Sequence, residues 1–451
     1  MKHSEIIIIG SSFAGVSSAL TARQLYPNKR VLIIEKEGSI GHIPSSLNLL
    51  LKEEFKHLSD KTFVNEEQLE ASGVELLLNN EVLDIDLANK SLIVEDENTH
   101  ESYRYDKLIL AMGSSPISER ISGSNHPKVL TTKTLEASKK ALQQIEGSDR
   151  ILIAGGGQIG LEAADAFNQV AKNVTLVEAS DQLAFKYFDS DMTQLLEQKI
   201  QESGVHVIKG HYVESIHSQD TELNVVLSQD LELLTDHVML AVNFRPNTKL
   251  IEDQVQCHLD KTIEVDEYLE TSVPDVFAVG DLIRTPYSHT ETDYYLPLVN
   301  HAYISGKIAA MNLYQKTTSV PQSLRVTGSK LFGLYMVSVG LTEQEAALFY
   351  PIETTILEKE TTKENLSQIT VKLITKKESG QLIGAQVYSQ SDILPLADLL
   401  AISINTQMTD EALAIQDRLF YSGDFSISEC IYACALKSYQ KRLSGVISDG
   451  D

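Results

Sequence analysis

Two glycine-rich loops in this chain have the residue spacing that holds a dinucleotide. The first, Gly10-Ser11-Ser12-Phe13-Ala14-Gly15, follows the predicted strand 5–9, and the second, Gly155-Gly156-Gly157-Gln158-Ile159-Gly160, follows the predicted strand 151–154. Glycines let the backbone turn sharply and approach a pyrophosphate, whose charge is attracted by the unpaired N–H groups at a helix N-terminus. Ser12 replaces glycine at the middle of the first loop, where a small side chain is tolerated. Two such loops predict two bound dinucleotides and electron transfer between them.

Each loop is followed by a carboxylate at the end of a second apolar strand. Glu35 follows the run 31–34, and Glu178 follows the run 174–177. A carboxylate at this place accepts hydrogen bonds from ribose hydroxyls. The segment 179–184 contains no Lys or Arg that could pair with a 2′-phosphate. The second site is therefore predicted to take NADH in preference to NADPH.

The elements that must position these residues follow an α/β pattern. Strand and helix patterns alternate in the first part of the chain, which predicts parallel sheets. Beyond about residue 321 the pattern becomes β-rich and then helical, which predicts a further α+β domain. Outside the two loop units, the expected strands are 91–94, 102–105, 107–111, 275–279, 368–375 and 380–387, and the expected helices are 300–313, 393–404 and 426–443.

Composition limits the class of protein and its partners. A chain of 451 residues is long enough for two or three domains. Its formal charge of −25 disfavours nucleic acid and anionic membranes as partners, and no apolar run reaches the length of a membrane span. The first strand begins almost at the N-terminus, so we expect no signal peptide and a cytoplasmic location. The three cysteines form neither a disulfide framework nor a metal-ligand cluster, so no metal is expected.

Taken in order, these landmarks resemble the pyridine nucleotide-disulfide oxidoreductases, in the branch of NADH peroxidase, NADH oxidase and coenzyme A-disulfide reductase. The resemblance covers almost the whole chain and includes, besides the two loops, Glu35-Lys36, Ala111-Met112-Gly113, Glu162, Arg245-Pro246-Asn247-Thr248, Val279-Gly280-Asp281, Leu296-Pro297-Leu298 and Lys330-Leu331-Phe332. It implies an FAD domain in two pieces, 1–117 and 247–320, with an NAD domain at 118–246 inserted between them. A C-terminal domain at 321–451 would form a homodimer.

The resemblance also implies which residues hold the two cofactors. The first loop with Glu35 and Lys36 would hold the ADP part of FAD, and Asp281, after Gly280, would bind its ribityl chain. The residues expected near the flavin are Ala111, Met112, Gly113, Leu298 and Val299. The residues expected to hold NADH are Gly155, Gly157, Gln158, Ile159, Gly160 and Glu178, with Tyr187 at the adenosine end and Asn243 beside the pocket.

The redox cysteine of the family is absent from its expected position, which falls on Ser45. A hydroxyl group cannot cycle through oxidised states as a thiolate does, so peroxide or disulfide reduction by the usual thiol route is excluded. Two interpretations of Ser45 remain open. Its oxygen could cap the next helix by accepting an early helical N–H, or it could bind near the flavin.

Three further departures from the family pattern surround the same site. Phe13 replaces the histidine of the peroxidases, Gln158 replaces a tyrosine that covers the flavin, and Asn243 replaces a glycine. His42 is the titratable side chain nearest to Ser45 in sequence, and is either a general acid or a packed or surface histidine.

Two of the three cysteines raise a separate hypothesis. Cys430 and Cys434 lie one helical turn apart on the last predicted helix. They could supply a thiol to the partner subunit in trans, or they could be core or interface residues. The remaining cysteine, Cys257, carries no assigned role.

These observations predict a homodimeric flavoprotein that takes hydride from NADH onto FAD and passes the electrons to a non-thiol acceptor. Dioxygen, giving hydrogen peroxide, is the simplest acceptor; a quinone-like molecule or an electron-transfer protein are alternatives. A second hypothesis is a flavin-binding sensor without NADH turnover, which Gln158 and Asn243 motivate. A third is a disulfide reductase that uses a C-terminal cysteine in trans.

Overall fold

The computed structural model describes residues 1–95, 99–361, 367–417 and 427–448. The chain divides into two compact units. The first unit comprises Met1–Gly147, Val242–Tyr287 and Glu291–Ser323, and the second comprises Ser148–Ala241, Ser288–Thr290 and Leu324–Asp451. The predicted boundaries after 117, 246 and 320 remain predictions.

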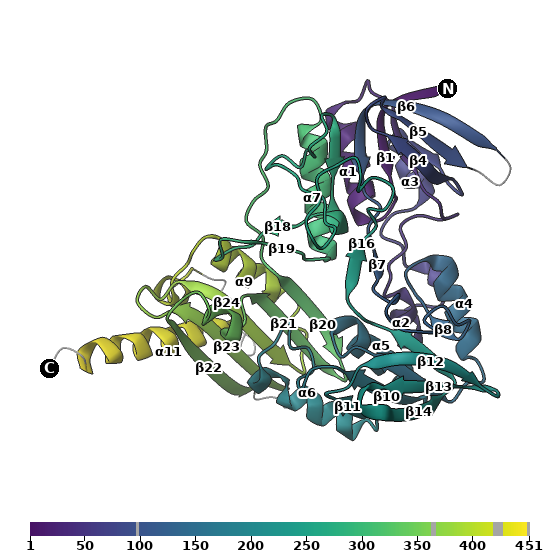
Figure 1. Ribbon diagram of the computed structural model, residues 1–451. Coiled ribbons are helices and arrows are strands. Elements are labelled where there is room, and N and C mark those ends of the chain that lie inside the picture. The colour runs from purple at the N-terminus through teal and green to yellow at the C-terminus, as the bar shows by residue number, and fades with distance from the viewer. Residues whose placement is uncertain (96–98, 362–366, 418–426, 449–451) are drawn as a thin grey trace. The chain divides into compact units, whose positions relative to one another are not determined.

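The first unit is built on a parallel sheet that continues into an antiparallel extension (Figure 1). Its strands lie in the order β3-β2-β1-β6-β5-β4, and β17 pairs with β6. Strands β1, β2, β3, β6 and β17 are parallel, whereas β4 and β5 are antiparallel to their neighbours. The bounds are β1 Lys2–Ile9, β2 Val31–Ile34, β3 Val74–Leu77, β4 Glu81–Asp86, β5 Ser91–Glu95, β6 His100–Leu110 and β17 Val276–Ala278.

The central strands of this sheet consist of β-branched and other apolar residues that are buried on both faces. Ile6 to Ile9 and Val31 to Ile34 are all buried, as expected of parallel strands covered by helices. Helices α1 (Phe13–Leu25) and α7 (Val299–Asn312) pack side by side (Figure 1). A Cβ on Gly306 would lie 2.3 Å from the Ala14 carbonyl oxygen, so only glycine permits this approach.

Shorter elements connect this sheet to the rest of the first unit. Strands β7 and β16 form a two-stranded antiparallel sheet, as do β18 and β19. The bounds are β7 Ser114–Pro116, β8 Val129–Leu130, β16 Phe244–Pro246, β18 Thr285–Pro286, β19 Asp293–Tyr294, α2 Ser46–Leu51, α3 Glu66–Ala71, α4 Leu135–Ile145, and the 3₁₀ helices η1 Leu58–Asp60 and η3 Gly280–Leu282.

The second unit contains a second parallel sheet, in which β11, β10, β9 and β15 lie in that order. Helices α5 and α6 belong to this part, together with an antiparallel sheet of β12, β13 and β14. The bounds are β9 Arg150–Ala154, β10 Asn173–Glu178, β11 His206–Lys209, β12 Val213–Gln219, β13 Glu222–Leu227, β14 Leu231–Thr235, β15 His237–Leu240, α5 Gln158–Gln169, α6 Ser190–Glu202, and the 3₁₀ helix η2 Ser228–Asp230.

The rest of the second unit is an antiparallel sheet with the order β20-β21-β24-β23-β22 (Figure 1). Helices α9 and α11 pack against one face of this sheet, where Val371, Leu400 and Cys430 share one apolar core. The bounds are β20 Val326–Leu331, β21 Leu334–Gly340, β22 Ile352–Thr361, β23 Ser367–Lys376, β24 Leu382–Ser389, α8 Glu343–Ala346, α9 Leu396–Asn405, α10 Asp410–Ala414 and α11 Ile427–Ser448.

The predicted α/β class, with two parallel nucleotide-type sheets and an α+β region at the C-terminal end, is confirmed. One detail differs, because the predicted strands 102–105 and 107–111 form the single strand β6. The register of its pairing with β1 is the same on either side of Asp106, with Ser4 opposite Tyr105 and Ile6 opposite Lys107, so the strand continues through this residue. Ser426, the expected start of the last helix, lies outside the described residues. No helix in the described chain has the length and apolarity that crossing a membrane requires.

Candidate functional site

The first glycine loop makes a turn that leaves no room for a side chain at Gly10 or Gly15. Gly10 has a φ of +104°, and a Cβ on it would lie 2.4 Å from the Ala111 carbonyl oxygen. A Cβ on Gly15 would lie 1.9 Å from the Gly10 carbonyl oxygen. The loop leads from β1 through Ser12, the N-cap residue, into α1. Bare backbone at a helix N-terminus is the cradle that a pyrophosphate requires.

The carboxylate of Glu35 binds this loop directly. Its Oε2 atom accepts hydrogen bonds from the backbone N–H and the hydroxyl of Ser11, both at 2.8 Å. Its Oε1 atom accepts the backbone N–H of Glu37 at 3.0 Å. Lys36, between the two glutamates, is exposed. The structure thus brings the first loop and Glu35 together.

The expected flavin segment, Ala111 to Gly113, is held in place by backbone hydrogen bonds. The Ala111 N–H donates to the Ile9 carbonyl at 2.9 Å. Asn247 binds the next two residues, because its side-chain amide donates to the Met112 carbonyl and its backbone N–H donates to the Gly113 carbonyl, both at 2.9 Å. Asn247 belongs to the Arg-Pro-Asn-Thr motif, so two distant family motifs meet here.

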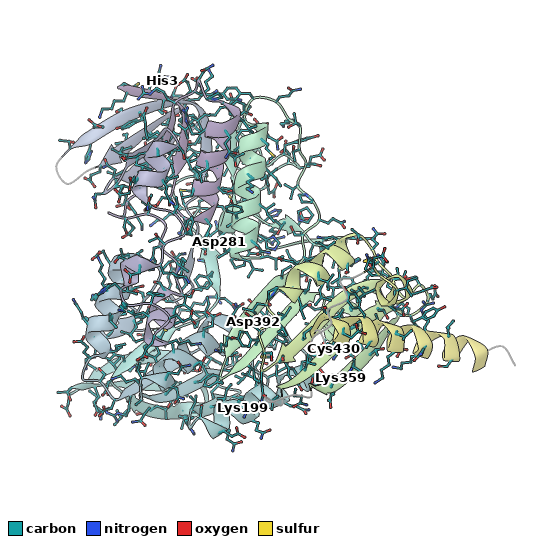
Figure 2. The ribbon with its side chains drawn as sticks, turned by 180° about the vertical axis from the view of Figure 1, so that it is seen from behind. His3, Lys199, Asp281, Lys359, Asp392 and Cys430 are labelled. Atoms are coloured by element: carbon teal, nitrogen blue, oxygen red, sulfur yellow. The ribbon has the colours of Figure 1, made fainter. Side chains whose placement is uncertain are left out.

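Asp281 lies in the turn after β17, beside α7 (Figure 2). The Ser114 hydroxyl donates to Asp281 Oδ2 at 2.6 Å, and burial raises the pKa of this carboxyl. Gly280 adopts a φ of +64°. Leu298 is the N-cap residue of α7, and Val299, the first residue of that helix, is exposed. Asp281 and the start of α7 therefore share one region of the first unit.

Ser45 is the residue before α2, but it does not make the hydrogen bond of an N-cap. The described α2 backbone donates no hydrogen bond to the Ser45 side chain, so the capping interpretation is wrong in that respect. Nearby, Ser46 Oγ and Asn48 Oδ1 are buried without a hydrogen-bond partner among the described residues. Buried polar atoms are normally satisfied. Unpaired ones in this segment fit a bound polar ring system such as the flavin of FAD.

His42 has a defined hydrogen-bonding geometry. Its Nε2 atom lies 3.3 Å from the Thr132 carbonyl oxygen and 3.3 Å from the Ser138 hydroxyl. A carbonyl only accepts, so Nε2 carries the proton. Nδ1 is then a lone-pair acceptor, and it is buried without a partner in the described chain. Burial lowers the pKa of His42, which favours the neutral ring. Of the two interpretations of His42, this arrangement fits a packed histidine, and its free acceptor nitrogen suits a proton acceptor better than a general acid.

Phe13 and Asn243, two of the departures from the family pattern, make local contacts. Phe13 stacks on Phe63, with ring centroids 4.1 Å apart and planes inclined by 17°. The Asn243 carbonyl accepts the Ile117 N–H at 2.7 Å. The position of Phe13 is therefore filled by an aromatic pair, and it offers no titratable group.

The second loop repeats the geometry of the first. Gly155 has a φ of +111°, and a Cβ on it would lie 2.3 Å from the Ala241 carbonyl oxygen. A Cβ on Gly160 would lie 1.8 Å from the Gly155 carbonyl oxygen. Gly157 is the N-cap residue of α5, and Ile159 in its first turn is exposed.

Glu178 closes this loop as Glu35 closes the first. It is buried, its Oε2 accepts the Gly156 N–H at 2.6 Å, and its Oε1 accepts the Ser180 N–H at 2.7 Å. Lys186, just beyond the segment 179–184 considered from the sequence, interacts electrostatically with Glu178. The structure thus brings the second loop and its carboxylate together.

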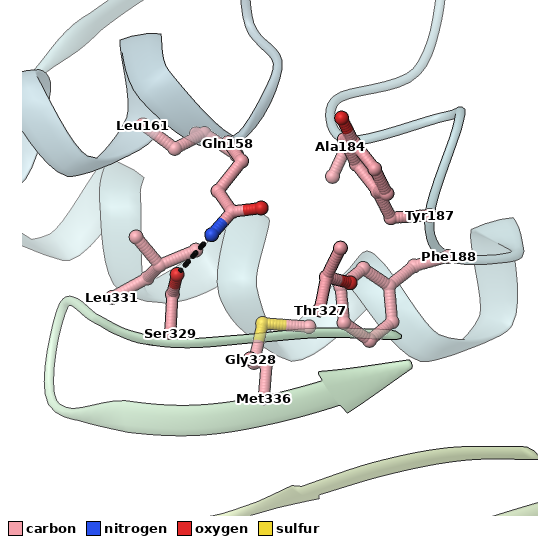
Figure 3. A pocket seen from close by; sticks show the side chains of 10 residues that line it. All are labelled: Gln158, Leu161, Ala184, Tyr187, Phe188, Thr327, Gly328, Ser329, Leu331 and Met336. Carbon is pink, nitrogen blue, oxygen red and sulfur yellow. Dashed lines mark hydrogen bonds between the residues drawn. The ribbon is translucent and has the colours of Figure 1, made fainter. Parts of the chain in front are cut away.

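A small pocket opens beside the second loop, within the second unit (Figure 3). Gln158 points into it and donates to Ser329 Oγ at 2.8 Å and to Glu162 Oε1 at 3.2 Å. The Ser329 hydroxyl also donates to Glu162 Oε1 at 2.5 Å. The lining residues are Gln158, Leu161, Ala184, Tyr187, Phe188, Thr327, Gly328, Ser329, Leu331 and Met336.

Tyr187 lies on the opposite side of this pocket from Gln158 (Figure 3). The guanidinium carbon of Arg325 lies 5.7 Å from the centre of its ring, and burial raises the pKa of the phenol. Arg325 also pairs with Glu345, with Nη1 and Oε1 at 2.8 Å. Ser329 and Arg325 were not predicted as site residues. Ser329 directly precedes the motif Lys330-Leu331-Phe332, but the sequence analysis gave that motif no site role.

The C-terminal cysteines lie in the core of the second unit. Cys430, on α11 (Figure 2), and Cys434 are both fully buried. Burial raises the pKa of Cys434 to about 12 and also raises that of Cys430. Neither thiol is poised to act as a thiolate. Among the described residues there is also no group of His, Cys, Asp and Glu that could hold a metal ion.

The chain has two nucleotide-binding loops, and each is hydrogen-bonded to its own carboxylate. This arrangement is typical of oxidoreductases that bind two dinucleotides, and comparison with known proteins gives the same class. Residues 4–306 match the family described as pyridine nucleotide-disulphide oxidoreductase. An NADH oxidase of Enterococcus faecalis is 29% identical over 423 residues, which cover 92% of this chain and 95% of that protein. A CoA-dependent NAD(P)H sulfur oxidoreductase of Pyrococcus abyssi is 28% identical over 435 residues, with coverages of 93% and 95%.

Solved structures give the same result. The water-forming NADH oxidase of Lactobacillus brevis, determined with NADH bound, superposes with a TM-score of 0.92 at 27% identity and covers 98% of this chain and 100% of that one. A pyridine nucleotide-disulfide family oxidoreductase of Enterococcus faecalis gives 0.86 at 32% identity, with coverages of 97% and 99%. This chain belongs to the pyridine nucleotide-disulphide oxidoreductase family, and the predicted enzyme class, an FAD-dependent NAD(P)H oxidoreductase, is confirmed.

Proposed function

We propose that this protein oxidises NADH and passes the electrons through FAD to a non-thiol acceptor, with dioxygen reduced to hydrogen peroxide. The observation that supports this proposal most directly is Ser45, which places a hydroxyl group at the position of the family's redox thiol. The buried, protonated Cys430 and Cys434 support the same reading. The names of the matched NADH oxidases support NADH as donor and oxygen as acceptor.

The residues of the first unit fit FAD. The first loop and Glu35 would hold its ADP part, and Asp281 would bind its ribityl chain. Bound FAD would supply the hydride acceptor and the reductant for the second substrate. The chain itself positions the reactants and sets the polarity around them. Neutral His42, with Nδ1 as acceptor, would take up a proton at that site.

The second loop and Glu178 would hold NADH. Both oxygens of Glu178 already accept backbone N–H groups, so the side chain is fixed beside the proposed ribose position. The Glu178 carboxylate would repel a 2′-phosphate placed there, whereas Lys186 would attract it; the proposed preference for NADH over NADPH rests on the repulsion outweighing the attraction. The ratio of kcat/KM values for the two nucleotides tests this preference.

An anaerobic NADH titration followed by flavin absorbance tests the main proposal. We expect complete flavin reduction by about one NADH per FAD, without a long-wavelength thiolate–flavin band. Under air, hydrogen peroxide should form in a one-to-one ratio with the NADH consumed. Uptake of two equivalents of NADH would contradict the thiol-free route. A low peroxide yield per NADH consumed would mean that oxygen is reduced to water. Slow NADH consumption under air would instead favour a quinone-like molecule or an electron-transfer protein.

One observation supports a second candidate, a flavin-binding sensor without turnover. Gln158 is held by both Ser329 and Glu162, so it does not stand free beside the pocket. If this arrangement excludes nicotinamide, NADH will fail to bleach the flavin anaerobically, whereas dithionite will. Rapid bleaching by NADH would eliminate this candidate.

We also propose a homodimer located in the cytoplasm. Exposed apolar side chains on α11, such as Leu436 and Leu443, support a subunit interface there. Light scattering of the purified protein should give twice the chain mass of 49.9 kDa. A monomer at micromolar concentration would contradict the proposed dimer.

A further inference from the structure

Three buried polar residues form a row across the C-terminal sheet of the second unit. Ser338 on β21 pairs with Gln386 on β24, and Gln386 pairs in turn with Lys372 on β23. Their exposed fractions are 2%, 0% and 0%. We call Ser338, Gln386 and Lys372 the polar row.

The polar row faces away from the apolar core of this sheet. Successive side chains of a strand point to opposite faces. The sequence neighbours of the row, Val337, Val339, Val371, Leu373, Ala385 and Val387, all belong to the core that contains α9 and α11 residues. The row must therefore lie on the other face. A fully buried lysine and glutamine are costly to the fold unless they are paired.

One short segment, residues 187–191, supplies a partner to each member of the polar row. The Ser338 hydroxyl donates to the Tyr187 carbonyl oxygen. Gln386 binds Asp189 twice, because its Oε1 accepts the Asp189 N–H at 3.0 Å and its Nε2 donates to Oδ2 at 2.7 Å. Lys372 Nζ lies 2.8 Å from both carboxylate oxygens of Asp191.

Helix α8 completes the arrangement around Asp189. The backbone N–H of Glu343 donates to Asp189 Oδ2 at 2.9 Å. The Glu343 carboxylate lies 2.7 Å from Lys372 Nζ, which is also 3.2 Å from Asp189 Oδ2. Lys372 is thus the cation that three carboxylates share.

We propose that the polar row positions the NADH-binding segment 179–188, with Lys372 as its principal positioning residue. This inference rests on the proposed function. The segment begins after Glu178, which is fixed to the second loop, and it ends at Asp189, which is fixed to the polar row. Tyr187 and Ala184, which line the pocket, lie between these two anchors. Holding both ends restricts the segment before the nucleotide arrives, so less ordering is needed on binding.

Lys372→Met tests this role because it removes the charge while keeping the length of the side chain. Asp189, Asp191 and Glu343 would then repel one another, and the end of the segment would loosen. We expect the KM for NADH to rise at least tenfold while kcat changes less than twofold. Amide hydrogen exchange of residues 180–191 should become faster. Lys377→Met, at an exposed lysine just beyond β23, is the matched control and should change neither quantity.

Charge rescue separates positioning from general damage. In Lys372→Met/Asp191→Asn one of the repelling charges is gone, so the KM should return to within about threefold of the wild-type value. A merely structural loss at residue 372 would not be rescued in this way. If Lys372→Met fails to fold, Ser338→Ala replaces it, with an expected two- to fivefold rise in KM. Unchanged KM and unchanged exchange in the folded variant would overturn the inference.

The outcomes also distinguish this inference from the proposed function. If the wild-type protein fails to bind NADH, the proposed function is wrong, but faster exchange in residues 180–191 of the variant still reports on the polar row. If the wild type binds NADH and the variant binds it equally well with unchanged exchange, only the inference is wrong.

Discussion

Ser45 belongs to the same short segment as Ser46 and Asn48, whose buried side-chain oxygens lack partners in the described chain. Neutral His42 belongs to the same segment, with its acceptor nitrogen unpaired. In the proposed function these residues would set the polarity around the flavin, and none of them can store electrons. The proposed chemistry therefore depends on the oxygen atom of Ser45, which replaces a sulfur atom.

Ser45→Cys should restore a second electron store. A cysteine there would lie among polar neighbours and could form a thiolate or an oxidised sulfur species. We expect anaerobic NADH uptake to rise from about one to about two equivalents per FAD, and the peroxide yield under air to fall. Ser45→Ala is the control and should leave the stoichiometry at one. Identical titrations for the cysteine variant and the wild type would show that residue 45 does not control the chemistry.

His289 should make folding stability dependent on pH. Burial, with a smaller contribution from Lys376, lowers its pKa from 6.5 to about 4. Below pH 6.5 the unfolded chain binds a proton that the folded chain does not, so stability is full above this pH and falls as the pH approaches 4. His289→Asn removes this loss, and asparagine tolerates the φ of +65° at this position. Denaturant unfolding at pH 7 and pH 4.5 should show the variant losing less stability, by roughly 2 kcal/mol. An equal loss in both proteins would contradict the assignment.

At the scale of elements, the sequence predicted those parts of the site whose residues lie close together in the chain. The glycine loops, Glu35 and Glu178 were predictable because strand, turn, helix and carboxylate follow one another within a short stretch of chain. The polar row was not, because Lys372 lies 181 positions from Asp191 and Ser338 lies 151 positions from Tyr187. Lys372 lies among the apolar residues of the predicted strand 368–375, and a polar residue that conflicts with its local pattern often belongs to a functional or strained site. The lysine at this position was therefore the one feature of the sequence that could have indicated the polar row.

The close approach of helices α1 and α7 can be tested by a substitution at Gly306. Gly306→Ala would place a Cβ 2.3 Å from the Ala14 carbonyl oxygen, and the two helices would have to separate. We expect a destabilisation of about 1–3 kcal/mol, together with weaker FAD retention, because α1 begins at the first loop. Thermal unfolding and the flavin-to-protein absorbance ratio measure both effects. Met311→Ala, at an exposed position on α7, is the control. Wild-type values for Gly306→Ala would contradict the close approach.

For the whole molecule, the solvent exposure of the three cysteine thiols indicates which of them could take part in redox chemistry. Cys430 and Cys434 are fully buried, whereas Cys257 is partly exposed. We expect a thiol reagent to modify at most Cys257 in the native protein and all three thiols in denaturant. The Cys430→Ser/Cys434→Ser variant, if folded, should retain NADH oxidation. Loss of turnover with normal FAD content would revive the hypothesis of a thiol supplied in trans.

Glu35 and Glu178 each bind the backbone of their own loop through hydrogen bonds between protein atoms. Each loop is therefore held in its turn by the protein's own carboxylate, and the two sites share this design although they belong to different units. The thermodynamic consequence is a nucleotide-binding step without coupled folding. Calorimetry should accordingly find a heat-capacity change that corresponds to the ligand's own buried surface alone.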